Sequence, residues 1–148
     1  MMRAIALFGS SADEAVPAVL RVLSSLGYRT FLVKKVRKEE LGEELEGAGG
    51  KILVGSRHMK ITMKYKAELD DVIRVAKLCP EVQPDFLILV GFDEAAERSD
   101  MIKIAVVKSD KEKERVMKIL KEPVAGICNE SSVDDVVRKA VEMKIFIR

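Results

Sequence analysis

Residues Arg3–Phe8 have the sequence RAIALF, an apolar run that ends at Gly9-Ser10-Ser11. A short apolar run bounded by turn residues predicts a buried β-strand. The apolar residues that follow are spaced as on one face of a helix, which Asp13 is placed to cap and Gly27 to end. Residues 28–33 are predicted to form a second strand. A strand, a helix and a strand within about 30 residues are the unit from which parallel sheets are built.

The rest of the chain continues this alternation of strands and helices. Strands are predicted at 51–55, 58–66, 86–90, 101–107 and 124–127, helices at 68–78 and 111–121, and a last helix capped by Ser131 or Ser132. The charged segment 34–46 is expected to be a loop or a short exposed helix. We therefore predict an α/β three-layer sandwich with a mostly parallel sheet, helices on both faces and Arg3–Phe8 at its centre.

Segment 58–66 alternates strictly between apolar and polar residues, which is typical of a half-buried strand with an antiparallel neighbour. Its apolar side is formed by Met59, Ile61, Met63 and Tyr65. These side chains are expected either in the core or in a seam between two subunits. Its basic side includes Lys60, Lys64 and Lys66, a pattern that protects exposed sheet edges. The functional interpretation of the same lysines is a strip that binds a phosphate-bearing ligand.

Composition narrows the class of protein. The chain has 148 residues, 26 Lys plus Arg and 24 Asp plus Glu, and 48% hydrophobic residues, which indicates one ordered domain spanning 1–148. A net charge of +2 argues against a nucleic-acid-binding protein, and the lack of a long apolar run argues against a membrane span, so we expect a cytoplasmic protein.

Individual residue types narrow the chemistry. One histidine excludes a His cluster, and Cys79 and Cys128 are expected to be buried core thiols that bind no metal. The only side-chain amides are Gln83 and Asn129, while Lys and Glu are abundant, a pattern that favours a thermophile.

The loop after the first strand is where a parallel α/β fold binds anions. A phosphate loop has the sequence GxxxxGK[ST], in which Lys binds the phosphates and the hydroxyl binds magnesium. When this pattern is laid on Gly9, the required Gly, Lys and Ser or Thr are replaced by Glu14, Ala15 and Val16. The carboxylates of Asp13 and Glu14 would satisfy the helix end themselves and repel an anion. Replacing residues 14–16 by Gly, Lys and Thr is expected to create affinity for GTP with magnesium.

The order of several short motifs resembles the molybdopterin-guanine dinucleotide biosynthesis protein B (MobB) family. The motifs are FGSS, LGYRTFLVKK, EGAGGKILVGS, PDFLILVGF, IKIAVVKSD and the closing PVAGICNESSVDDVVRKA. The resemblance implies a P-loop NTPase-like fold that binds GTP with magnesium, usually as a homodimer. It also implies assistance in attaching GMP to molybdopterin, the pterin that carries molybdenum or tungsten. A homodimer formed through segment 58–66 is therefore expected.

This chain departs from the family pattern at several positions. The residues that match the family's phosphate loop are Gly9, Ser10, Ser11, Asp13 and Glu14, and they form a degenerate loop. The family's Lys-His pair falls on Lys34 and Lys35, its AGA on Gly47-Ala48-Gly49, its acidic strand end on Val90 and its PKI on Ile102-Lys103-Ile104. The chain lacks the Lys that would bind the phosphates, the hydroxyl that would bind magnesium and the acidic residue at the strand end. Their joint absence argues against GTP hydrolysis, and no catalytic residue is predicted.

Three functional hypotheses follow from these observations. The first is a non-hydrolysing MobB-like adaptor that binds the pterin or a protein of molybdenum or tungsten cofactor biosynthesis. The second is a GTP-binding accessory protein with an unorthodox loop, and the third is a structural or regulatory homodimer that keeps only the fold. Contacts to a ligand or partner are expected from the side chains of Lys34, Lys35, Lys60, Lys64 and Lys103.

Overall fold

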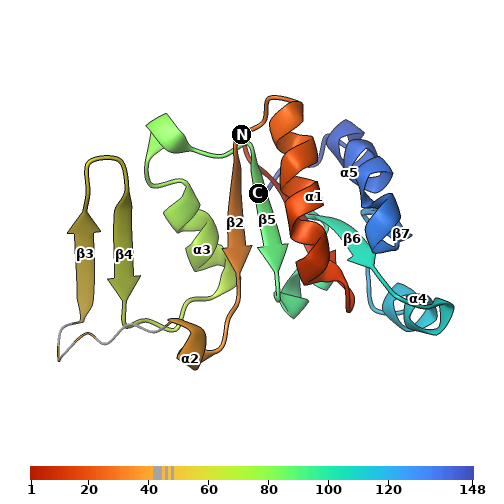
Figure 1. Ribbon diagram of the computed structural model, residues 1–148, viewed down its shortest axis with the longest axis horizontal. Coiled ribbons are helices and arrows are strands. Elements are labelled where there is room, and N and C mark those ends of the chain that lie inside the picture. The colour runs from red at the N-terminus through yellow and green to blue at the C-terminus, as the bar shows by residue number, and fades with distance from the viewer. Residues whose placement is uncertain (42–44, 46, 48) are drawn as a thin grey trace.

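The computed structural model describes residues 1–41, 45, 47 and 49–148. In chain order the elements are β1 (Arg3–Phe8), α1 (Ala12–Ser25), β2 (Thr30–Lys34), α2 (Lys38–Leu41), β3 (Gly50–Val54), β4 (Met59–Met63), α3 (Leu69–Ala76), η1 (Pro80–Val82), β5 (Phe86–Val90), η2 (Asp93–Glu97), β6 (Ile102–Val106), α4 (Asp110–Met117), β7 (Val124–Cys128), η3 (Glu130–Ser132) and α5 (Val133–Glu142). The predicted alternation of strands and helices is confirmed, with ends that shift by a few residues (Figure 1).

The main sheet has five parallel strands in the order β2-β5-β1-β6-β7. β1 lies in the centre, as predicted, and pairs with β5 on one side and β6 on the other. Because all the strands run the same way, their carboxyl ends meet at one edge of the sheet, where the loops after β1, β2, β5, β6 and β7 gather (Figure 1).

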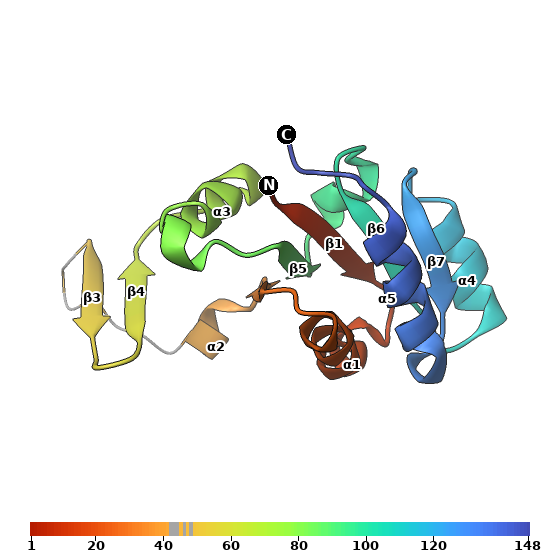
Figure 2. The ribbon, with the colours of Figure 1, turned by 90° about the horizontal axis from the view of Figure 1, so that it is seen from above.

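Helices cover both faces of the main sheet, which confirms the three layers (Figure 2). Alternate side chains of β1 enter the two cores: Ile5 and Leu7 pack with α1 and α5, while Ala4 and Ala6 pack with α3 and η2. β5 and β6 are buried along their whole lengths, which explains why β5 is a continuous apolar run and why β6 is apolar apart from Lys103.

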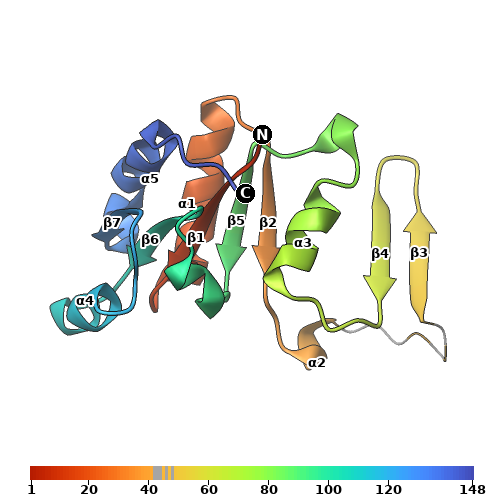
Figure 3. The same ribbon diagram turned by 180° about the vertical axis from the view of Figure 1, so that it is seen from behind.

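The strands β3 and β4 form a separate antiparallel hairpin beyond α3, at the opposite end of the molecule from α4 (Figure 3). Ile52 lies opposite Ile61 and Val54 opposite Met59, so these four side chains share one face. The side chains of Met59, Ile61 and Met63 are 61%, 41% and 58% exposed. The expectation that they belong to a core is therefore wrong for the single chain, because no described element covers them.

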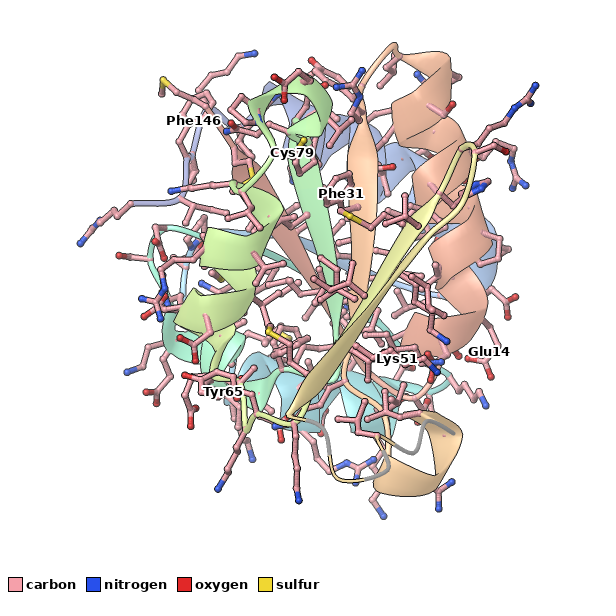
Figure 4. All side chains as sticks on the ribbon, turned by 90° about the vertical axis from the view of Figure 1, so that its left-hand side faces the viewer. Glu14, Phe31, Lys51, Tyr65, Cys79 and Phe146 are labelled. Carbon is pink, nitrogen blue, oxygen red and sulfur yellow. The ribbon has the colours of Figure 1, made fainter. Side chains whose placement is uncertain are left out.

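Several local expectations are corrected. The residue that caps α1 is Ser11 rather than Asp13, because α1 begins earlier, at Ala12. Ser132 precedes α5 but makes no side-chain cap bond, and Asn129 caps η3 by accepting a hydrogen bond from the Ser132 N–H. Cys128 is buried as predicted, whereas Cys79 is exposed, and the view in Figure 4 shows Cys79 on the loop that follows α3.

Within the described residues, no helix combines the length and the apolar character that crossing a bilayer would require.

Gly9 is a position where the fold leaves no room for a side chain. Its φ is +98°, and a Cβ added there would lie 2.2 Å from the carbonyl oxygen of Val106. We expect Gly9→Ala to lower the free energy of unfolding by at least about 3 kcal/mol, from strain and a backbone clash together. Gly27→Ala is the control, because Gly27 also has a positive φ (+86°) but open space around it. It should cost only about 1 kcal/mol. Equal losses in urea unfolding would contradict this account.

Candidate functional site

The loop after β1 is a three-residue connection whose polar groups already have partners inside the protein. The Ser11 N–H donates to the Val106 carbonyl (3.1 Å) and the Ala12 N–H to the Gly9 carbonyl (3.2 Å). α1 therefore begins at Ala12, and the positions that a phosphate loop would use for its cradle belong to the helix. Two of the N–H groups that a phosphate cradle would need are thus already used.

The carboxylate of Glu112, from the first turn of α4, lies beside this loop and takes up hydrogen-bond donors that an outside anion would otherwise use. It accepts hydrogen bonds from the Ser10 N–H (2.8 Å), the Ser10 hydroxyl (2.7 Å) and the Lys108 N–H (2.8 Å). The Ser10 hydroxyl, followed by the Lys108 N–H, holds the pKa of the Glu112 carboxyl below its usual value. The loops after β1 and β6 are thereby joined through an anion that belongs to the protein itself.

A crevice of about 220 Å³ lies between the carboxyl ends of β1 and β5. Its charged side chains are Asp13 and Asp93, both acidic. Asp13 forms an ion pair with Lys34 at the end of β2 (2.9 Å), and this hydrogen bond raises the pKa of the Lys34 ammonium group. Val90, where the family pattern has an acid, is buried in the core at the end of β5. A crevice lined by carboxylates opposes a polyphosphate electrostatically.

The structure brings some of the predicted site residues together. Gly9, Ser10, Ser11, Asp13 and Lys34 meet at the carboxyl edge of the sheet. The exposed Glu14 follows in the first turn of α1. Lys35 lies at the same edge, where its N–H donates to the Val90 carbonyl (2.9 Å) and its Cβ packs against Gly91.

Other predicted contacts lie elsewhere. Lys60 and Lys64 belong to the hairpin, away from this edge. Lys103 is fully buried near the amino end of β6, and its ammonium group donates to the carbonyl oxygens of Arg98 and Glu122. Burial lowers the pKa of Lys103. The expectation that Lys103 contacts a ligand is wrong, because its charge serves two internal carbonyls at the opposite end of the strand.

Restoring the phosphate-loop sequence at residues 14–16 is not expected to create a nucleotide site. Ala15 is fully buried and Val16 nearly so, since both lie on the inner face of α1. A lysine at position 15 would place its charge in this core, which is strongly unfavourable without a partner.

The residues do not fit a magnesium nucleotide. Within the described ranges there is no group of three His, Cys, Asp or Glu side chains placed to hold a metal ion. The N–H groups of Ser10 and Ser11 in the short loop have partners, and the crevice beside the loop is lined by Asp13 and Asp93. Of the family's AGA positions, Gly47 and Gly49 are described, whereas Ala48 lies outside the described residues.

The contact of Glu112 was not anticipated from the sequence. Ser109 and Glu112 stand three residues apart, a spacing that predicts a helix start at Ser109, which the structure has. That pattern says nothing of Ser10, which lies 102 residues away in the chain. Only the pairing of β1 with β6 brings the two loops together.

Solved structures with a similar fold are found by comparison. A MobB protein homolog from Bacillus stearothermophilus matches 95% of this chain and 96% of its own, at 15% identity and a TM-score of 0.70. The chain has the fold of MobB proteins. The structure of Bacillus subtilis MobB matches 97% of this chain and 99% of its own (15% identity, TM-score 0.68). A protein described as molybdopterin-guanine biosynthesis protein B matches 93% of this chain and 96% of its own (18% identity, TM-score 0.67).

No sequence profile of a known family and no curated protein sequence matches the chain. The likeness to MobB proteins therefore lies in the fold, and it confirms the α/β architecture of a mostly parallel sheet with an antiparallel hairpin.

The contacts of Glu112 predict a pH-dependent contribution to stability. At neutral pH, Glu112→Gln should lower the free energy of unfolding by about 1 kcal/mol, since a partly exposed charged acceptor is lost. The folded pKa of Glu112 is below its usual 4.5, so this contribution is present above that pH and is lost as the pH falls through the folded value. Urea unfolding of both proteins between pH 7 and pH 3 should show the difference shrinking. A difference that grows on acidification would contradict the assignment.

Proposed function

We propose that this chain is a MobB-like accessory protein of molybdopterin-guanine dinucleotide cofactor biosynthesis that acts as a non-hydrolysing adaptor. The observation that carries the proposal is the likeness in fold to MobB proteins, which extends over 93–97% of the chain. One of these proteins is described by its part in molybdopterin-guanine biosynthesis. A likeness over nearly both whole chains supports a related role more strongly than a shared nucleotide-binding core would.

The adaptor role is supported by the contents of the degenerate loop, which consists of Gly9, Ser10, Ser11, Asp13 and Glu14. Catalysis of phosphoryl transfer depends on cradling N–H groups, a cationic side chain and a metal held by hydroxyl and carboxylate ligands. In this chain the Ser10 N–H binds Glu112, Lys34 is paired with Asp13, and β5 ends in Val90. We therefore infer a protein that acts by binding rather than by hydrolysis.

We also propose that the adaptor is a homodimer formed through the β3–β4 hairpin. The apolar face of the hairpin consists of Gly50, Ile52, Val54, Met59, Ile61 and Met63. An isolated two-stranded hairpin is marginally stable in water, so this face needs a cover. A second copy of the chain can supply this cover, because a twofold axis places the same apolar face on both sides of the interface. Tyr65, beside α3 in Figure 4, donates to Asp71 (3.2 Å) and ties the hairpin's end to the main body.

The dimer is tested by one charge placed on either face of the hairpin. Ile61→Asp puts the charge on the apolar face and is expected to shift the protein to monomers, because a buried unpaired carboxylate is unfavourable. Thr62→Asp is the matched control, since Thr62 is the neighbouring residue on the face that carries Lys51, and it should leave the dimer intact. Sedimentation velocity at 10–100 µM (roughly the range in which weak dimers form) distinguishes the two. A wild-type monomer throughout that range would refute the proposal.

The adaptor role is tested by two measurements on the wild-type chain. Titration with GTP and magnesium should give no binding tighter than about 1 mM, an affinity that corresponds to about −4.1 kcal/mol. A MobB protein with an intact GxxxxGK[ST] sequence is the positive control. In cells that lack their own MobB protein, expression of this chain should raise the content of molybdopterin-guanine dinucleotide.

The outcomes of these measurements separate the three hypotheses. Micromolar GTP binding would favour the GTP-binding accessory protein over the adaptor. No GTP binding together with an unchanged dinucleotide content would favour a structural or regulatory homodimer.

A further inference from the structure

The Glu112 carboxylate is surrounded by the kinds of donor that bind an oxyanion, namely two N–H groups and one hydroxyl group. One carboxylate oxygen accepts from the Ser10 hydroxyl (2.7 Å) and the Lys108 N–H (2.8 Å), and the other accepts from the Ser10 N–H (2.8 Å). These three donors come from loops that follow two neighbouring parallel strands, β1 and β6. N–H and hydroxyl donors arranged in this way recognise oxygen atoms that carry negative charge, whatever atom those oxygens are bonded to.

The geometry differs from that of an ordinary helix cap. In a capping box the carboxylate at the third helical position returns to the N–H of its own capping residue. Glu112 instead reaches Lys108, one residue before the cap, and Ser10 on a different strand loop. The Glu112 side chain therefore behaves as a ligand of the β1 loop. It remains partly exposed, so an anion from solution has access to the same donors.

A polar hollow of about 280 Å³ adjoins these donors at the carboxyl ends of β6 and β7. It shares Lys108 with the carboxylate's donors, and its other polar residues are Ser109, Asp110, Lys113, Asn129 and Ser132. Neither Lys108 nor Lys113 has an ion pair in the part of the chain that the structure describes. The two ammonium groups outnumber the one carboxylate of Asp110, and this net positive charge favours a dianion over the single charge of a carboxylate.

We propose that the loops after β1 and β6 form an oxyanion site that this chain fills with its own Glu112, and that a phosphate monoester or inorganic phosphate takes the site when Glu112 leaves. The tethered carboxylate acts at a millimolar or higher effective concentration, so it excludes dilute phosphate from the resting protein. The site is not required by the adaptor role proposed above, and it would remain if that role were disproved.

Glu112→Ala tests the proposal by removing the internal anion and leaving the three donors in place. In thermal unfolding, 10 mM phosphate is expected to raise the Tm of the variant by about 3–6 °C over sodium chloride of equal ionic strength, which corresponds to millimolar binding. The wild type should shift by less than about 1 °C, because its site is filled. Acetate, which replaces the missing carboxylate, should also stabilise the variant alone.

Two further variants make the test specific. Glu114→Ala is the matched control, because the Glu114 side chain is exposed on the same helix and makes no hydrogen bond or ion pair with another described residue; it should respond as the wild type does. Adding Ser10→Ala to Glu112→Ala should weaken phosphate binding about tenfold, since one hydroxyl donor is lost. Tighter binding of ribose 5-phosphate than of inorganic phosphate would assign the polar hollow to the organic part of a monoester, and equal binding would assign the site to phosphate alone.

The proposal fails if folded Glu112→Ala, verified by circular dichroism, shows no stabilisation by phosphate beyond that by chloride. It also fails if phosphate stabilises the wild type and the variant equally. Should Glu112→Ala not fold, Glu112→Gln keeps the size of the side chain and removes its charge. The ³¹P resonance of phosphate should then be broader in the presence of this variant than in the presence of the wild type. Equal line widths would refute the site.

Discussion

The carbonyl group of Val106 fixes the path of the chain where β1 becomes α1. It accepts the Ser11 N–H and lies where any side chain at position 9 would have to go. The connection is therefore short, and α1 starts at Ala12. From this one contact follow the placement of Asp13 beside Lys34 and the position of Ser10 next to Glu112. A longer loop would have freed the same N–H groups for an outside ligand.

At the carboxyl edge of the sheet, several groups that could contact an anion already have partners inside the protein. Asp13 is neutralised by Lys34, and the donors of Ser10 and Lys108 are taken by Glu112. A polyphosphate would gain little from Lys34, Ser10 or the Lys108 N–H, because a new contact to any of them would break an existing one. This chain thus combines the fold of MobB proteins with a carboxyl edge whose loops are joined to one another by short-range electrostatic contacts.

The main sheet could be predicted from the sequence because its signals are local. Arg3–Phe8 and Phe86–Val90 were predicted to the residue, since continuous apolar runs of that length are typical of buried parallel strands. The cap of α1 could not be predicted, because the hydrogen bond from the Ser11 N–H to the Val106 carbonyl is a tertiary contact; the cap is Ser11 rather than Asp13, and the helix begins at Ala12. The resemblance of Ile102-Lys103-Ile104 to the family's PKI suggested a ligand contact for Lys103. The carbonyl groups of Arg98 and Glu122, which accept hydrogen bonds from Lys103 instead, lie in loops whose course only the tertiary structure defines. For the same reason the contact between Ser10 and Glu112, which are 102 residues apart in the chain, could not be predicted from the spacing of residues in the sequence.

The two-faced character of the hairpin has a consequence for how many partners the protein holds. Strand pairing places Lys51 opposite Thr62 and Leu53 opposite Lys60, so a second, more polar face lies behind the apolar one. A twofold dimer joined through the apolar faces would carry two identical copies of this second face, both pointing outward. Such an assembly is bivalent, and a partner with two suitably spaced complementary surfaces would bind it with an avidity far above that of either contact alone. A partner with one such surface would be bound weakly and released quickly.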